Sequence, residues 1–266
     1  MAALDHVVIH VGRGGMDDAA AASETLGFTL TPRGYHSMGS INHLIMFGTD
    51  YLELLGVPAG DTTSRPELQG APLGLDGLVF KTADADATFA HLQAVGMAGE
   101  PPKSFSRPVG TPDGSQEARF RTVTVRSDVF AAGRVYFCEH NTPELVWRPD
   151  LPELTAHANG AQAFKEIIIV SDQPAEEAAN FALLLNGTAA GGNTVVVEGF
   201  RVVVLSWEGY SGRFGANAVA AGGRKSIFGA VGVASTEVAA GAEPELRVME
   251  GFETLLEFWP HTAAAL

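Results

Sequence analysis

The amino-acid sequence predicts an α+β protein in which tandem β-α-β-β-β units pair into cup-shaped mixed sheets. One observation is a repeat: a strand-like run, a helix-forming run and a closing glycine recur three times in 266 residues. A second observation is that further strand-like segments follow each copy. A unit of this size is too small to bury its own sheet face, so we expect neighbouring units to share a curved sheet. The spacing from the third strand residue to the glycine is nearly constant, from His6 to Gly27, from Gly77 to Gly96 and from Glu166 to Gly187.

The first unit begins with the β-branched run LDHVVIHV at residues 4–11, which is typical of a strand. Asp17 and Asp18 are expected to cap a helix formed by AAAASETL. Gly27 is expected to close this helix, because the residue after a helix often adopts a positive φ. The segments FTLTPRG, NHLIMF and YLELLGV then predict three strands.

The second unit follows the same order. LDGLVFKT at residues 75–82 predicts its first strand, and Asp84 and Asp86 precede the helix-forming run ATFAHLQAV. Gly96 is expected to close this helix, and ARFRTVTVRS and RVYFCEHN predict later strands of the unit.

The third unit starts with FKEIIIVS at residues 164–171. Pro174 is expected at the first position of its helix, where proline is well tolerated, and Asn186-Gly187 is expected to end it. A fourth, shortened unit is expected to run from Ile227 to GFETLLEFW near the end of the chain.

A proline-rich stretch, RPDLP, separates the second unit from the third. Together with the polar THANGAQ after it, this stretch is the best inter-domain linker in the sequence. We therefore expect a first domain over residues 1–150, with modules at 1–57 and 72–147. A second, degenerate domain of the same kind is expected over residues 160–266.

The composition excludes several classes of protein. With 17 Lys and Arg against 31 Asp and Glu, the formal net charge is −14, which argues against nucleic-acid binding and against docking on an anionic membrane. No apolar run is long enough to span a bilayer, and the N-terminus lacks the pattern of a signal peptide. The single cysteine, Cys138, leaves no disulfide framework. We expect a cytoplasmic monomer or homodimer that binds a small molecule.

Alternation along the first strand favours a polar interior. His6, Val8 and His10 share one face of this strand, while the other face is continuously apolar and is expected to pack on helices. Glu53 lies inside the apolar run YLELL, where an unpaired charge would be unfavourable, so it is expected to meet a cation. A solvent-facing glutamate at a strand edge is the alternative.

Two further groups of residues could carry chemistry. Glu139 and His140 are adjacent, so in a regular strand only one of them reaches the interior, although a bulge would change which one. The polar cluster of His36, Asn42 and His43 is expected either to bind a substrate carbonyl or carboxylate or to serve turn formation.

These residues and repeats resemble the vicinal oxygen chelate superfamily, which includes glyoxalase I, fosfomycin-resistance enzymes and extradiol dioxygenases. The stretch from His36 to Asn42, followed by LIMFGTDYLELLGV, is similar to its glyoxalase-like subgroup in particular. The resemblance implies a cup that holds a divalent metal (Zn, Ni, Fe, Mn or Mg) on residues from the first and last strand of each module. The implied metal ligands are His6, Glu53 and Glu139. One departure is that the counterpart of His6 in the second module is Gly77, which has no side chain.

Two functions remain open from the sequence. The resemblance implies a metal-dependent lyase or isomerase acting on a small molecule with vicinal oxygens, with Glu139 or His140 as a catalytic base and His36, Asn42 and His43 as substrate-binding residues. The alternative is a protein without a metal that sequesters a small molecule in the same cup, which the absent side chain at Gly77 favours. In a third arrangement, one domain catalyses and the other serves dimerisation.

Overall fold

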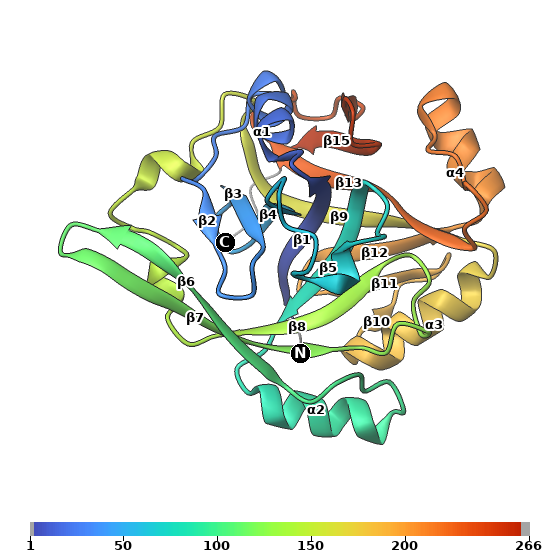
Figure 1. Cartoon of the computed structure of the whole chain (residues 1–266). Coiled ribbons are helices and arrows are strands. Elements are labelled where there is room, and N and C mark those ends of the chain that lie inside the picture. The colour runs from blue at the N-terminus through green and yellow to red at the C-terminus, as the bar shows by residue number, and fades with distance from the viewer. Residues whose placement is uncertain (1–2, 262–266) are drawn as a thin grey trace.

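The computed structural model describes residues 3–261 and shows two curved mixed sheets flanked by helices (Figure 1). The first sheet has the strand order β2-β3-β4-β1-β5-β8-β7-β6. Its strands are β1 (Leu4–Arg13), β2 (Gly34–Tyr35), β3 (Ile41–Met46), β4 (Tyr51–Val57), β5 (Gly74–Lys81), β6 (Lys103–Thr111), β7 (Gly114–Thr124) and β8 (Arg134–His140).

The first sheet consists of two β-α-β-β-β modules joined side by side. Strand β1 runs parallel to β4 of its own module and antiparallel to β5, which is in turn parallel to β8 of the second module. The edge strands β2 and β6 approach each other, because the N–H of Ser37 donates to the carbonyl of Ser106 at 2.8 Å. The sheet therefore curls into a cup, as the repeat predicted.

The second sheet has the order β10-β11-β12-β9-β13-β15-β14. This sheet is formed by the third and fourth units of the chain. The third unit contains a helix, whereas the shortened fourth unit has three strands and, among the described residues, no helix between them. The strands are β9 (Ala161–Ser171), β10 (Thr188–Ala189), β11 (Thr194–Val197), β12 (Phe200–Leu205), β13 (Ser226–Ser235), β14 (Glu245–Met249) and β15 (Thr254–Pro260).

Most helix signals are confirmed, although Asp86, expected before the second helix, lies in its first turn. Asp84 caps α2 by accepting hydrogen bonds from two backbone N–H groups, and Pro174 is the first residue of α3. Gly15, rather than Asp17 or Asp18, occupies the N-cap of α1, so the two aspartates lie in the first helical turn, where their charge suits the helix dipole. The helices are α1 (Met16–Thr25), α2 (Ala85–Ala94), α3 (Pro174–Leu185) and α4 (Trp207–Phe214), with short 3₁₀ helices η1 (Pro66–Leu68), η2 (Pro143–Leu145), η3 (Pro152–Thr155) and η4 (Gly215–Asn217).

One apolar core joins the two sheets. Buried residues from β1, β5, β9 and β13 belong to the same cluster. Phe130 stacks on Phe181 with ring centroids 4.1 Å apart, and Phe47 meets Phe164 edge to face at 5.1 Å. Removing either sheet would therefore expose large aromatic side chains of the other. No helix within residues 3–261 is long and apolar enough to cross a membrane.

Candidate functional site

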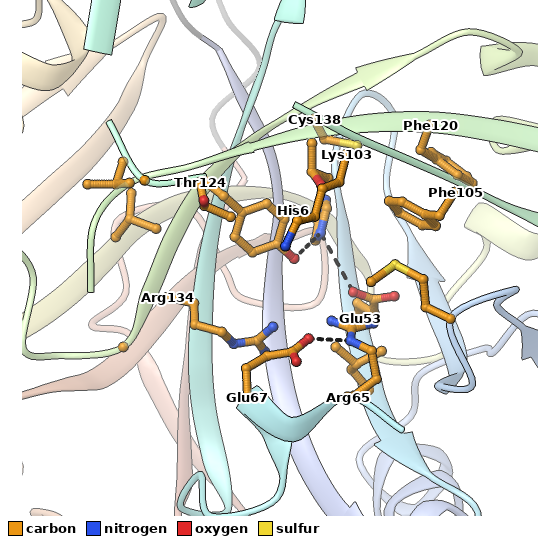
Figure 2. A pocket seen from close by; sticks show the side chains of 18 of the residues that line it. His6, Glu53, Arg65, Glu67, Lys103, Phe105, Phe120, Thr124, Arg134 and Cys138 are labelled. Carbon is orange, nitrogen blue, oxygen red and sulfur yellow. Dashed lines mark hydrogen bonds and ion pairs between the residues drawn. The ribbon is translucent and has the colours of Figure 1, made fainter. Parts of the chain in front are cut away.

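The concave side of the first sheet encloses a cavity of about 820 Å³, within the size range of small-molecule sites. Strands of both modules and the segment around η1 line it, and Figure 2 shows their side chains converging. Residues that alternate along β1, β3, β4 and β8 reach the cavity, because successive strand residues face opposite sides. Among the polar side chains that line it are His6, His36, Asn42, Tyr51, Glu53, Arg65, Arg107 and Tyr136.

His6 lines this cavity and is almost fully buried. Its ring stacks on Tyr51, with centroids 4.4 Å apart and an angle of 12° between the planes. Its Nε2 atom faces two polar groups, the hydroxyl of Tyr136 at 3.4 Å and Oε2 of Glu53 at 3.6 Å (Figure 2). The structure therefore places Glu53 beside His6 inside the cup, on the adjacent strand.

Asp5 holds His6 from behind. The register between β1 and β5 shifts between Leu4 and His6, and this irregularity lets Asp5 and His6 meet on the same side although they are neighbours. Oδ1 of Asp5 lies 2.7 Å from Nδ1 of His6, and Oδ2 lies 2.8 Å from Nε2 of His140. Burial by itself raises the pKa of Asp5, but the hydrogen bonds from His140 and His6 outweigh it and hold that pKa well below its usual range. The ionised carboxylate accepts a hydrogen bond from Nδ1–H of His6, so Nε2 of His6 is left to act in the cavity.

Glu53 is oriented from its other side by Asn42. The amide Nδ2 of Asn42 donates to Oε1 of Glu53 at 2.7 Å and lies 3.4 Å from Nε2 of His36. Burial lowers the pKa of His36 to about 4, so this imidazole is neutral at pH 7. The structure therefore brings His36 and Asn42 together with His6 and Glu53 in one cavity.

Most cations of the cavity are paired with acids. Arg65 forms an ion pair with Glu67. Arg134 forms an ion pair with Asp76 at 2.6 Å. Arg107 differs, because within residues 3–261 no acidic group lies within ion-pair distance of its guanidinium.

The second module places Tyr136, not Glu139, at the position that corresponds to Glu53. In the first module His6 pairs with Tyr51, two residues before Glu53. In the second module Gly77, the counterpart of His6, pairs with Arg134, two residues before Tyr136. Glu139, the ligand that the resemblance implies for the second module, is therefore three residues beyond the position that corresponds to Glu53.

Glu139 consequently lies outside the cavity. Its neighbour Cys138 lines the cavity, so strand alternation turns Glu139 to the outer face. There Oε2 of Glu139 accepts a hydrogen bond from the N–H of Ala85 at 3.0 Å, at the N-terminus of α2. This position suits a carboxylate because the helix dipole is positive there. The structure does not bring Glu139 together with His6 and Glu53.

His140 and His43 do not line the cavity either. His140 contacts the site through Asp5 and through Phe120, whose ring centroid lies 5.2 Å from its own, and it packs against Trp147 at 4.9 Å. His43 points away from the cup, where its Nδ1 atom lies 2.7 Å from the carbonyl of Thr31. Its neighbours Asn42 and Leu44 face the cavity, so alternation along β3 excludes His43 from substrate contact.

The residues present do not fit the metal centre that the resemblance implies. Within residues 3–261 there is no group of three or more His, Cys, Asp or Glu side chains placed to hold a metal ion. The two positions of the second module are Gly77 and Tyr136. A Cβ atom on Gly77 would lie 2.9 Å from Cβ of Val8, so the packing of β1 against β5 leaves no room for a ligand there. His6 and Glu53 are two donors, whereas catalytic zinc sites have three protein ligands.

The second sheet carries a smaller cavity of about 550 Å³, which is lined by ion-paired carboxylates and arginines. Glu166, the counterpart of His6, lies on β9, and Glu257 lies on β15. Arg213, from α4, forms ion pairs with both carboxylates, and Arg201 forms another with Glu166. The two carboxylates thus share one cavity, but both are engaged by arginines of the same chain.

Sequence reasoning missed four residues of the site: Asp5, which lies behind His6 and is an acceptor for two imidazoles, and the cavity residues Tyr51, Tyr136 and Arg107. Strand alternation would have placed Tyr51 on the same face as Glu53. The double role of Asp5 depends on a register shift, and the position of Arg107 depends on how β6 closes the cup. Neither the register shift nor the closure is marked by a local pattern in the sequence.

A paired β-α-β-β-β cup with a buried histidine and carboxylate on adjacent strands defines a protein of the vicinal oxygen chelate superfamily. Within it, the sequence model for the glyoxalase-like domain matches residues 4–185, more than half of the chain. The chain belongs to this glyoxalase-like domain family. No curated protein matches the sequence.

Solved structures share the fold at low sequence identity. A hypothetical protein from Staphylococcus aureus is 14% identical and superposes with a TM-score of 0.71, covering 98% of this chain and 100% of its own. A mutant of 4-hydroxymandelate synthase from Streptomyces coelicolor is 12% identical, with a TM-score of 0.54 over 88% of this chain and 71% of its own. A variant of methylmalonyl-CoA epimerase from Streptomyces coelicolor, in complex with 2-nitronate-propionyl-CoA, is 19% identical and covers 52% of this chain and 96% of its own, at a TM-score of 0.38.

Proposed function

We propose that this protein is an isomerase or lyase of the glyoxalase-like group that moves a proton on a small molecule with neighbouring oxygens. One observation carries the proposal. Asp5 fixes the tautomer of His6, so that Nε2 of His6 points into a buried cavity and lies 3.6 Å from the carboxylate of Glu53. A histidine oriented by a carboxylate is a common arrangement for general base catalysis.

His6 is the proton acceptor in this proposal. Its Nε2 atom takes a proton from a carbon next to a carbonyl group, and the electron pair of that C–H bond forms the carbon–carbon double bond of an enolate. The carboxylates of Asp5 and Glu53 stabilise the imidazolium that results. An isomerase returns the proton to a different carbon or face, whereas a lyase expels a group from the next carbon.

Tyrosine hydroxyls provide donors for the oxygens of the ligand. Tyr51 and Tyr136 both contact the ring of His6. Burial raises the pKa of each phenol well above its usual range, so both hydroxyls keep their protons at any physiological pH. A neutral O–H donor next to the base stabilises the negative charge that develops on the carbonyl oxygen.

Metal dependence, which the resemblance implies, is not needed for these steps. His6 and Glu53 provide the base and the balancing charge from the chain itself, and no step passes through a metal.

Solvent exchange tests the proposal even before the product is identified. The protein is incubated in D₂O with 2-oxo acids and 2-hydroxy ketones, and loss of the C–H signal next to the carbonyl is followed by proton NMR. We expect exchange with at least one compound, and a loss of about 100-fold or more in His6→Gln. His43→Gln and Glu139→Gln, which change the same residue types outside the cavity, should keep the rate. Equal rates in His6→Gln and the native protein would contradict the proposal.

A binding protein without turnover is the second candidate. It is favoured by Gly77, which packs under Val8 and removes one ligand position of the superfamily. In this case calorimetry would detect saturable binding of a compound, while no exchange of its C–H groups would occur in D₂O.

A further inference from the structure

We propose that Arg107 is a carboxylate-binding residue, so that the ligand of the first cup is a small organic monoanion whose carboxylate pairs with this guanidinium. The inference rests on the proposed function and deepens it, because it names the chemical class of the substrate.

Arg107 is a buried cation that forms no ion pair with any described residue, although the carboxylate of Glu53 is near enough to favour its charged form. Only 8% of its surface is exposed, yet its side chain lines the cavity. Within the described residues it forms no ion pair and its guanidinium donates no hydrogen bond to a protein group. Burial lowers the pKa of Arg107, although an arginine remains charged at physiological pH. A buried charge without a partner is unfavourable, and an anion from solvent would relieve that penalty.

The other cations of the cavity do not share this feature. Arg65, Arg126 and Arg134 each have an acidic partner from this chain. Lys103 is exposed to solvent, where its ammonium group is hydrated. The cavity is nevertheless lined by five Lys and Arg and only four Asp and Glu, in a chain with 17 of the former and 31 of the latter. This local excess of positive charge opposes the overall charge of the protein and favours an anionic ligand.

The position of Arg107 relative to the reactive groups is fixed by strand β2. A Cβ atom on Gly34 would lie 3.2 Å from Cδ of Arg107 and 2.3 Å from Oδ1 of Asn42, so these two side chains lie against the same glycine. The amide of Asn42 in turn donates to Glu53 at 2.7 Å. An anion on Arg107 would therefore lie near the Asn42–Glu53 pair, and Glu53 is in turn 3.6 Å from Nε2 of His6.

The charge and shape of the site favour a carboxylate over a phosphate. The planar guanidinium donates two parallel N–H bonds that match the two oxygens of a carboxylate. One unpaired positive charge balances a monoanion, whereas a phosphate would add a second negative charge close to Glu53. A 2-oxo acid has a carboxylate beside a carbonyl, and so combines an anchor for Arg107 with a carbon acid for His6.

Calorimetric titration with matched pairs of ligands tests the inference. The probes are pyruvate, 2-oxobutyrate and phenylpyruvate, the methyl ester of each, and inorganic phosphate. We expect at least one acid to bind, with its ester and phosphate at least about tenfold weaker. Arg107→Gln should weaken that acid by about tenfold or more without affecting its ester. Arg119→Gln, a change of an exposed arginine on β7, should leave binding within about twofold.

Several outcomes would overturn the assignment: binding of none of the acids, equal binding of acids and esters, tighter binding of phosphate, or unchanged acid binding in Arg107→Gln. Circular dichroism and thermal melting establish that the variants fold. If Arg107→Gln does not fold, Arg107→Lys keeps the charge but not the planar fork, and we expect it to weaken acid binding several-fold.

The same titrations separate this inference from the proposed function. If an acid binds through Arg107 but its C–H groups do not exchange in D₂O, the carboxylate site stands and the catalytic proposal fails. If C–H exchange occurs equally with acids and esters, the catalytic proposal stands and the carboxylate site is wrong.

Discussion

Oδ1 of Asp5 lies 2.7 Å from Nδ1 of His6, and this contact determines which nitrogen of the histidine faces the cavity. Two neighbours in the sequence meet in this way because the β1–β5 ladder is irregular at Asp5. The second carboxylate oxygen of Asp5 is held by His140, so the acceptor itself is fixed from two directions. The base of the proposed reaction is thus oriented by the backbone of one strand.

Replacing Asp5 by Asn tests this arrangement through stability. An amide presents one acceptor instead of two, so one imidazole loses its partner, and we expect the unfolding free energy to fall by about 2–4 kcal/mol at pH 7. The pKa of Asp5 is lower in the folded state, so its contribution is present above about pH 4 and is lost as pH falls further. Urea unfolding of Asp5→Asn and of the exposed control Asp113→Asn, at pH 7 and pH 3, measures the difference. An equal loss at both pH values would contradict the explanation.

The packing around Gly77 predicts a steric effect that a second substitution relieves. A Cβ atom there would meet Val8 at 2.9 Å, so Gly77→Ala should lower the unfolding free energy by about 1–3 kcal/mol. When Val8 is already alanine, Gly77→Ala should lower the unfolding free energy by less than it does in the native protein. Gly110→Ala serves as a control, since open space surrounds that glycine on β6. Strictly additive losses in denaturant unfolding would show that the two residues are not coupled.

Asp50 predicts a pH dependence of the opposite sign to that of Asp5. It lies in the turn between β3 and β4, and burial raises its pKa to about 7. The folded state therefore binds a proton that the unfolded state has released, so the contribution of Asp50 to stability falls as pH rises from about 4 to about 7. We expect Asp50→Asn to gain stability relative to the native protein by about 1–3 kcal/mol between pH 5 and pH 8. Melting curves that keep a constant difference between the two proteins across this range would contradict the shift.

Metal content is the fourth measurable consequence of the site. Two donors, His6 and Glu53, are too few for a tight centre, so protein purified without a histidine tag or chelator should contain well below one equivalent of transition metal. Elemental analysis of the native protein and of His6→Ala provides the measurement. One equivalent that is lost in His6→Ala would show that the cup binds a metal with donors from outside residues 3–261 or after rearrangement.

Local patterns predicted most of the elements because each depends on neighbours in the sequence, but residues 28–33, expected in a strand, are irregular and α4 was not predicted. The capping role of Asp84 and the start of α3 at Pro174 follow from helix-end chemistry, and the repeated order of strands and helices follows from periodicity. The resemblance to the superfamily put His6 and Glu53 in one cup, and strand alternation agreed with an inward-facing His6.

The rest of the site depends on register, which has no local signature. The parallel pairing of β5 with β8 decides that Tyr136 corresponds to Glu53, and the sequence alone aligned Glu139 there instead. The position of His43 follows instead from alternation within β3, because its side chain faces away from that of its neighbour Asn42. Arg107 reaches the cavity only because β6 closes on β2.

In the second cup, the buried charges are paired by residues of the same chain. Helix α4 supplies Arg213 to Glu166 and Glu257, so two inward-facing carboxylates obtain their guanidinium from the same chain. The first cup holds the complementary half of that arrangement, a guanidinium without its carboxylate. The two cups thus differ in the source of the carboxylate. In the second cup it comes from the chain itself. In the first cup a ligand from solution must provide it.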